Sequence, residues 1–199
     1  MSVVGQEAQS FFNPLIGRTA TFVLDGRQAN LDFARTVMSL LAQAGSTCAI
    51  LDLDALYSSN SDHIFSLLAP AEARSSILRI PEPGCDIESE LSGLFNATQR
   101  VILVDSLNSL YHLISLEDGS SRSRKLTFAV ASLSYFARTN AKAVILTMYR
   151  REGFPHSGTG RSISGLSDIT ATVDVRGQEL TVRSERGSAW RSVFLTRIP

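Results

Sequence analysis

Residues 101–106 are Val101-Ile102-Leu103-Val104-Asp105-Ser106, four apolar residues in a row followed by an aspartate and a serine. An apolar run without alternation is typical of a strand that is buried on both faces, as strands are in parallel sheets. Three more runs of this kind occur in the chain, at 21–24, 48–53 and 143–147. We therefore predict a mostly parallel sheet with helices on both of its faces.

The segments between these runs have the spacing of amphipathic helices. In 28–44, apolar residues recur every three or four positions, and Gly45 follows as a helix stop. The same spacing predicts helices over 88–97 and 122–139. Alternating strands and helices of these lengths favour an α/β fold in three layers.

The pattern changes near the C-terminal end. Residues 169–175, 179–184 and 192–198 alternate or are rich in β-branched side chains, and Arg-Gly pairs separate them at 176–177 and 186–187. This pattern predicts an antiparallel β-meander that extends the sheet.

The chain is predicted to be one domain. It has 199 residues, of which 44% are hydrophobic, which is enough for one sizeable core. We divide it into an N-terminal segment, 1–16, and a single core domain, 17–199. Within the core, 150–167 is rich in glycine and serine and is predicted to be a long loop, and 117–124 a polar surface connection.

Composition and charge exclude several classes of function. The formal net charge is +0, which argues against binding nucleic acid over the whole surface, although not against a local basic patch. The two cysteines lack metal-ligand spacing, and Cys48, inside an apolar run, is predicted to be a reduced core thiol. The three histidines are far apart, so we expect no metal site. We see neither a signal peptide nor a membrane-spanning run, and expect an intracellular protein, cytoplasmic or nuclear, without a membrane partner.

The order of these parts resembles the core of the RecA/RadA recombinase superfamily, over roughly residues 15–198. Residues 101–106 are similar to the family's Walker B strand, and 143–147 to the next strand, which leads into the mobile DNA-binding loop. The C-terminal meander is similar to the extension that closes the family's sheet. The short segment before the core resembles the core-only paralogues. The resemblance implies a RecA-like three-layer α/β/α core with a mostly parallel sheet, extended by an antiparallel β-meander.

The resemblance also shows which chemistry is missing. The family's P-loop, between the first strand and the first long helix, corresponds here to 24–31. Leu24 and Ala29 stand at its two glycine positions, Asn30 at its lysine and Leu31 at its Ser/Thr. Bare backbone must approach the phosphates, a cation must neutralise them and an oxygen must hold Mg²⁺. Because none of these requirements is met, we expect no nucleotide, no metal and no other cofactor.

The hydrolytic residues are altered as well. The family's water-activating glutamate corresponds to Asp54, one methylene shorter, and its polar sensor to Met148 and Tyr149. Asp105 remains as a residual Walker B aspartate, and we predict a structural role for it in capping a helix or turn. The sequence therefore predicts a pseudo-ATPase and not an enzyme.

Function is then expected to lie in surfaces. The candidate nucleic-acid contacts are arginines and a histidine in the predicted loop, with an incidental solvated loop as the alternative: Arg150, Arg151, His156 and Arg161. The candidate subunit contacts are aromatic, with packing in the chain's own core as the alternative: Phe11, Phe12 and Trp190.

Taken together, the resemblance implies a non-catalytic RecA-family paralogue, an accessory subunit in homologous recombination or DNA repair. Its expected partners are homologous RecA-family subunits, in a homo- or hetero-oligomer, and single-stranded DNA or RNA. Two alternatives stay open. One is a RecA-like ring subunit of an Elongator-type tRNA-modification complex. The other is a degenerate ATPase that a partner completes in trans.

Overall fold

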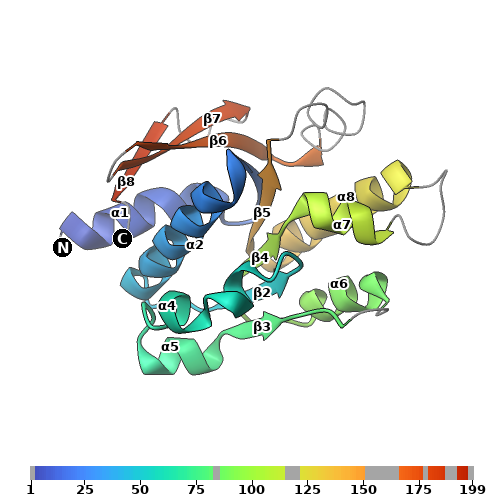
Figure 1. The fold of residues 1–199 in the computed structure, drawn as a ribbon, viewed down its shortest axis with the longest axis horizontal. Helices are drawn as coiled ribbons and strands as arrows, with labels where there is room; N and C mark the ends of the chain where they lie inside the picture. The colour runs from blue at the N-terminus through green and yellow to red at the C-terminus, as the bar shows by residue number, and fades with distance from the viewer. Residues whose placement is uncertain are drawn as a thin grey trace.

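The structure is a computed structural model that describes residues 3–82, 86–114, 122–150, 166–176, 179–186 and 192–196 (Figure 1). Within these ranges, eight strands form one sheet in the order β3-β2-β4-β5-β1-β6-β7-β8. The strands are β1 (Arg18–Leu24), β2 (Cys48–Asp52), β3 (Ile77–Arg79), β4 (Val101–Asp105), β5 (Ala143–Tyr149), β6 (Ile169–Arg176), β7 (Glu179–Arg186) and β8 (Ser192–Thr196). Neighbouring strands from β3 to β6 are parallel, whereas β7 is antiparallel to both β6 and β8. The predicted parallel sheet with an antiparallel extension is confirmed.

Helices cover both faces of this sheet (Figure 1). They are α1 (Val3–Phe12), the 3₁₀ turn η1 (Asn13–Leu15), α2 (Gly26–Gln43), α3 (Leu56–Ser59), α4 (Ser61–Phe65), α5 (Pro70–Ser75), α6 (Ile87–Phe95), α7 (Leu107–Ile114) and α8 (Arg122–Asn140). Helices α1 to α4 contribute to one buried apolar cluster, and α6, α7 and α8 contribute to a second. Alternate residues of the strands divide between the clusters, since Phe22 belongs to the first and Val23 to the second. The three-layer arrangement follows from this division.

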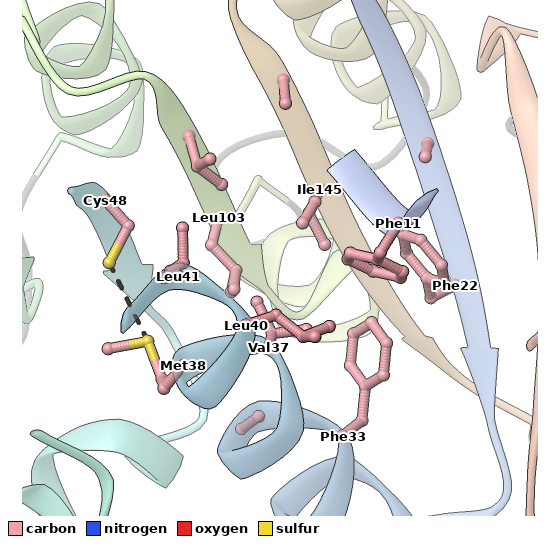
Figure 2. Packing of buried hydrophobic residues seen from close by; sticks show 14 of the residues in the cluster. Phe11, Phe22, Phe33, Val37, Met38, Leu40, Leu41, Cys48, Leu103 and Ile145 are labelled. Carbon is pink, nitrogen blue, oxygen red and sulfur yellow. Dashed lines mark hydrogen bonds between the residues drawn. The ribbon is translucent and has the colours of Figure 1, made fainter. Parts of the chain in front are cut away.

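The first cluster is built around three phenylalanines, on α1, β1 and α2 (Figure 2). The ring centroids of Phe22 and Phe33 are 4.8 Å apart, and those of Phe11 and Phe22 are 5.8 Å apart. Phe11 is fully buried and Phe12 is 8% exposed. Of the two alternatives for Phe11 and Phe12, a subunit contact or packing in the chain's own core, the burial of both rings agrees with the second. Helix α1 folds back on α2, and this apolar contact buries both rings inside the chain's own core.

The thiol of Cys48 lies in the same cluster, as predicted (Figure 2). It is free, and its Sγ lies 3.9 Å from Sδ of Met38. Burial raises the pKa of Cys48 to about 11. The thiol is therefore a core group, and it stays protonated at neutral pH.

Several predicted features lie outside the described residues. These are Cys85, Trp190, residues 117–121 of the polar connection, and 151–165 of the long loop, with Arg151, His156 and Arg161. No helix in the described ranges is long and apolar enough to span a membrane.

Candidate functional site

The candidate site lies where the chain leaves the carboxyl ends of β1, β4 and β5, which are neighbours in the sheet. Ligands of open α/β sheets bind at this edge. Strand β1 ends at Leu24, and the chain turns through Asp25 into α2. Gly26 has φ +86°, a left-handed conformation that glycine adopts without strain. The backbone N–H of Arg150 donates to the Leu24 carbonyl at 2.8 Å, which ties the ends of β1 and β5 together.

A network of side-chain hydrogen bonds occupies the centre of this edge. Nδ2 of Asn30 donates to Oδ1 of Asp105 at 2.7 Å and is 2.8 Å from the Tyr149 hydroxyl oxygen. The Thr147 hydroxyl donates to the same oxygen of Asp105. Asn30, Asp105 and Thr147 are all 0% exposed. The network therefore joins α2, β4 and β5 through buried polar groups.

Asp105 is held by neutral donors. Burial raises the pKa of Asp105 to about 6, against the lowering effect of the hydrogen bonds from Thr147 and Asn30. Within the described ranges it has no cationic partner, and its Oδ2 accepts no hydrogen bond. Burial, followed by the charge of Asp105, also raises the pKa of Tyr149. Burial therefore makes negative charge unfavourable at the centre of this network.

The two aspartates after β2 have separate structural tasks. The carboxylate of Asp52 accepts from the backbone N–H groups of Leu56, Tyr57 and Ser58, at 2.9, 3.3 and 2.8 Å. Asp54 accepts from the hydroxyls of Ser106, at 2.7 Å, and Ser109. Asp52 therefore caps the start of α3, and Asp54 fixes the start of α7 on the end of β2.

The role predicted for Asp105 is corrected in its detail. We expected the carboxylate of Asp105 to cap a helix or turn, but Asp52 makes the contacts of that kind. The Asp105 carboxylate instead bonds to side chains of α2 and β5. Sequence reasoning missed Thr147, and the only signal for it was a hydroxyl side chain near the end of an apolar strand.

The residues at the P-loop's glycine and Ser/Thr positions pack in or against the apolar core. Leu24 is 1% exposed and Ala29 is 9% exposed, and both belong to the first apolar cluster. Leu31 is half-buried and packs against that cluster. These side chains stabilise the contact between α2 and the sheet.

A cavity of about 320 Å³ lies beside the network, lined by Gly26, Arg27, Asp54, Tyr149 and Arg150. Both arginines are exposed, and neither forms an ion pair with another described residue. Of the four candidate nucleic-acid residues, Arg150 is thus placed at the mouth of this cavity. Among the described residues, this site included, no three histidine, cysteine or acidic side chains lie close enough to hold a metal ion.

The parallel sheet between two helical layers, the turn from β1 into α2 and an aspartate at the end of β4 define a RecA-like fold. Neither the family models nor the curated proteins include a match to this chain. Solved structures do match. The RadB recombinase superposes with a TM-score of 0.66 at 16% identity, over 100% of this chain and 96% of that one. A KaiC-like protein, PH0186 of Pyrococcus horikoshii OT3, gives 0.60 at 15% identity, over 89% of this chain and 85% of that one.

Both structures are RecA-family members, so the predicted resemblance is confirmed at the level of the fold. The nucleotide and magnesium that this fold implies do not fit the residues present. Asn30 cannot supply a positive charge, and its amide is already bonded to Asp105 and Tyr149. Leu31 has no oxygen for a metal ion. One carboxylate oxygen of Asp105 is bonded to Asn30 and Thr147, and the apolar contacts of Leu24, Ala29 and Leu31 form within the chain itself.

Proposed function

We propose that this chain is a non-catalytic RecA-like protein, an accessory subunit that assembles with related subunits and contacts nucleic acid in homologous recombination or DNA repair. The observation that carries the proposal is the bond between Asn30 and Asp105. It places an uncharged amide where the family has its lysine and uses that amide to hold a buried carboxylate. A triphosphate seated there would lack both its cation and its metal ligand.

Calorimetric titration with ATP and Mg²⁺ tests the loss of nucleotide binding. We expect no heat of binding at ligand concentrations up to about 1 mM, which corresponds to less than about 4 kcal/mol of binding free energy. A RecA-family protein with an intact P-loop, titrated in the same buffer, is the positive control. Micromolar affinity that depends on Mg²⁺ would overturn the proposal.

The basic mouth of the cavity supports the nucleic-acid part of the proposal. Arg27 and Arg150 line it with exposed guanidinium groups, and the predicted loop continues from Arg150. Guanidinium groups bind phosphate through charge-assisted hydrogen bonds. We expect the double variant Arg27→Ala, Arg150→Ala to weaken binding and to lower the salt dependence by about two ionic contacts.

Fluorescence anisotropy at two salt concentrations measures this effect with single-stranded DNA and with tRNA. Arg74→Ala is the matched control, because Arg74 is an exposed arginine on α5 that does not line the cavity. Tighter binding of single-stranded DNA would support a role in recombination, and tighter binding of tRNA would support the Elongator-type alternative. Identical binding by the double variant and the wild type would show that Arg27 and Arg150 do not contact nucleic acid.

The remaining alternative, an ATPase completed in trans, has less support. A partner would need to reach Asp105, whose side chain is fully buried beneath Asn30 and Thr147. Turnover by a reconstituted complex that disappears with Asp105→Ala would favour this alternative over the proposal.

A further inference from the structure

Helix α8 has an exposed aromatic stripe on the side that faces away from the sheet. Phe128 is 75% exposed and Tyr135 is 72% exposed, and they are one heptad apart on the helix. Between them lie two small residues, Ala131 and Ser132. The opposite side of the helix, with Leu126, Val130 and Leu133, is buried in the second apolar cluster. The stripe is therefore a second apolar face of a helix that is already packed.

Two hollows flank this stripe, and Phe95 and Phe128 line both of them. The first has a volume of about 350 Å³ and an apolar floor that includes Ile87 and Leu91. The second has a volume of about 480 Å³ and also contains Tyr135. The Phe95 ring stacks near Phe136, with centroids 5.2 Å apart, so this wall is fixed by the core. The surface thus offers both projecting rings and hollows of a size to accept them.

We propose that this face binds a second copy of the chain, with the two α8 helices antiparallel about a twofold axis near Ala131 and Ser132. In that arrangement Phe128 of one copy lies against Tyr135 of the other, and the small residues meet at the axis. Small residues at the crossing point let two helices approach closely, and a twofold interface requires such a self-complementary pattern. The inference specifies a partner for the proposed assembly and does not depend on the loss of nucleotide binding.

The charges along α8 do not prevent an antiparallel pair. The first turn of α8 contains no acidic residue, and Arg124 is exposed there. Antiparallel pairing sets Arg124 beside the partner's last turn, where free carbonyl groups carry partial negative charge. Lys125 and Arg138 would face each other across the pair, but Glu88 and Asp168 of the same chain neutralise them. The basic side chains of Lys125 and Arg138 are thus each paired with a carboxylate of their own chain.

The exposed apolar area determines how tightly the two copies are expected to bind. A phenylalanine or tyrosine buries about 150–250 Å² when fully covered. Phe128 is 75% exposed and Tyr135 is 72% exposed, so the four rings of a dimer would remove roughly 450–750 Å² from water. A stable interface buries about 1,200–2,000 Å² in total. The walls of the hollows must supply the rest, and we expect a dissociation constant in the micromolar range.

Sedimentation equilibrium over about 1–200 µM protein tests the pairing, since that range brackets a micromolar dissociation constant. We expect the wild type to approach twice the 21.6 kDa mass of the chain, and Phe128→Glu to stay at the monomer mass. Ile80→Glu is the control, because Ile80 is also apolar and 54% exposed but lies after β3. A wild type that is monomeric throughout, or a Phe128→Glu variant that dimerises as well as the wild type, would overturn the inference.

A cross-link checks the geometry and does not depend on the folding of the glutamate variant. In a Cys85→Ser background, Ser132→Cys places a thiol near the twofold axis, and mild oxidation is expected to give a disulfide-linked dimer. Gln28→Cys, at an exposed position on α2, should not cross-link. Equal cross-linking of the two variants would refute the α8 pairing even if a dimer exists. Failure of either test would leave the calorimetric result for ATP unaffected.

Discussion

Replacing Asp105 by asparagine should stabilise the protein at neutral pH, although the same change in a nucleotide-hydrolysing relative would remove a metal-binding carboxylate. Asp105→Asn keeps the shape of the side chain and removes its charge. The oxygen that accepts from Asn30 and Thr147 is retained. The new Nδ2 takes the place of Oδ2, which accepts no hydrogen bond from a described residue in the wild type.

The magnitude follows from the pKa of Asp105, which burial raises from 3.8 to about 6. Each pKa unit corresponds to about 1.4 kcal/mol, so ionising this buried side chain lowers the free energy of unfolding by about 3 kcal/mol. The folded state binds its proton more tightly than the unfolded state does. The favourable contribution is therefore fully present below pH 3.8 and is lost as the pH rises through about 6.

The amide of the variant sets the opposing effect. A buried N–H without an acceptor costs about 1–3 kcal/mol. Oδ1 of Asn30 has no partner among the described residues and belongs to the side chain already bonded to position 105, so it is the nearest candidate acceptor. We expect the variant to be more stable than the wild type by about 1–3 kcal/mol at pH 7.5, and to have little advantage at pH 4.

Urea unfolding of both proteins at pH 4 and pH 7.5 measures these values. The difference between the variant and the wild type should grow by about 2.4 kcal/mol from the lower pH to the higher, whatever the amide costs. Asp25→Asn, which removes an exposed carboxylate at the same edge of the sheet, is the control and should follow the wild type. If the advantage of Asp105→Asn is the same at both pH values, the reasoning from burial is refuted.

Two other substitutions test the roles of the N-terminal helix and the aspartate cap. Phe11→Ala should lower the free energy of unfolding by about 3–5 kcal/mol, because the ring is fully buried between α2 and β1. An unchanged urea midpoint would show that the ring does not contribute to the core. Asp52→Ala leaves the backbone N–H groups at the start of α3 without their acceptor, so it should lower the free energy of unfolding by about 1–3 kcal/mol. If the loss is local, amide hydrogen exchange should become faster at Leu56 to Ser58.

The long elements could be predicted from the sequence because each contains a pattern that one structure alone satisfies. The apolar run at 143–147 is confirmed as the body of β5, and the periodic segment 28–44 as α2. Strand β1 begins at Arg18, earlier than predicted, because Arg18 and Thr19 are polar and only their pairing with β5 makes them strand residues. Such boundaries depend on partners that are distant in the sequence.

The short elements could not be predicted for the same reason. Strand β3 has three residues and α3 has four, which are too few to show a period. Helix α3 is held by three hydrogen bonds to Asp52, and β3 by pairing with β2. The sequence also could not decide whether Phe11 is buried in the core, since an aromatic pair near an end of the chain fits a core and an interface equally well.

The candidate site shows the same limit. The absence of a lysine and a hydroxyl at 30 and 31 could be read directly from the sequence, but the bonds that replace them could not. Asn30 bonds to a residue 75 positions away, and Thr147 to one 42 positions away. No spacing rule connects these residues. They meet because the sheet places the ends of β4 and β5 side by side, with the first turns of α2 against them.

The network also gives Asp105 a structural role at a site where Asn30 and Leu31 stand at the positions of the family's P-loop lysine and hydroxyl. A buried carboxylate without donors would be strongly unfavourable, so Asp105 is tolerated only while Asn30 and Thr147 donate to it. Asn30 lacks the cation that phosphate needs, and at the same time it provides the neutral donor that this carboxylate needs. The two positions are therefore coupled: Asn30→Leu should be much less damaging in an Asp105→Asn background than in the wild type. If urea unfolding shows that the two substitutions change the free energy of unfolding additively, the side chains of Asn30 and Asp105 are not coupled and this explanation of Asp105 is wrong.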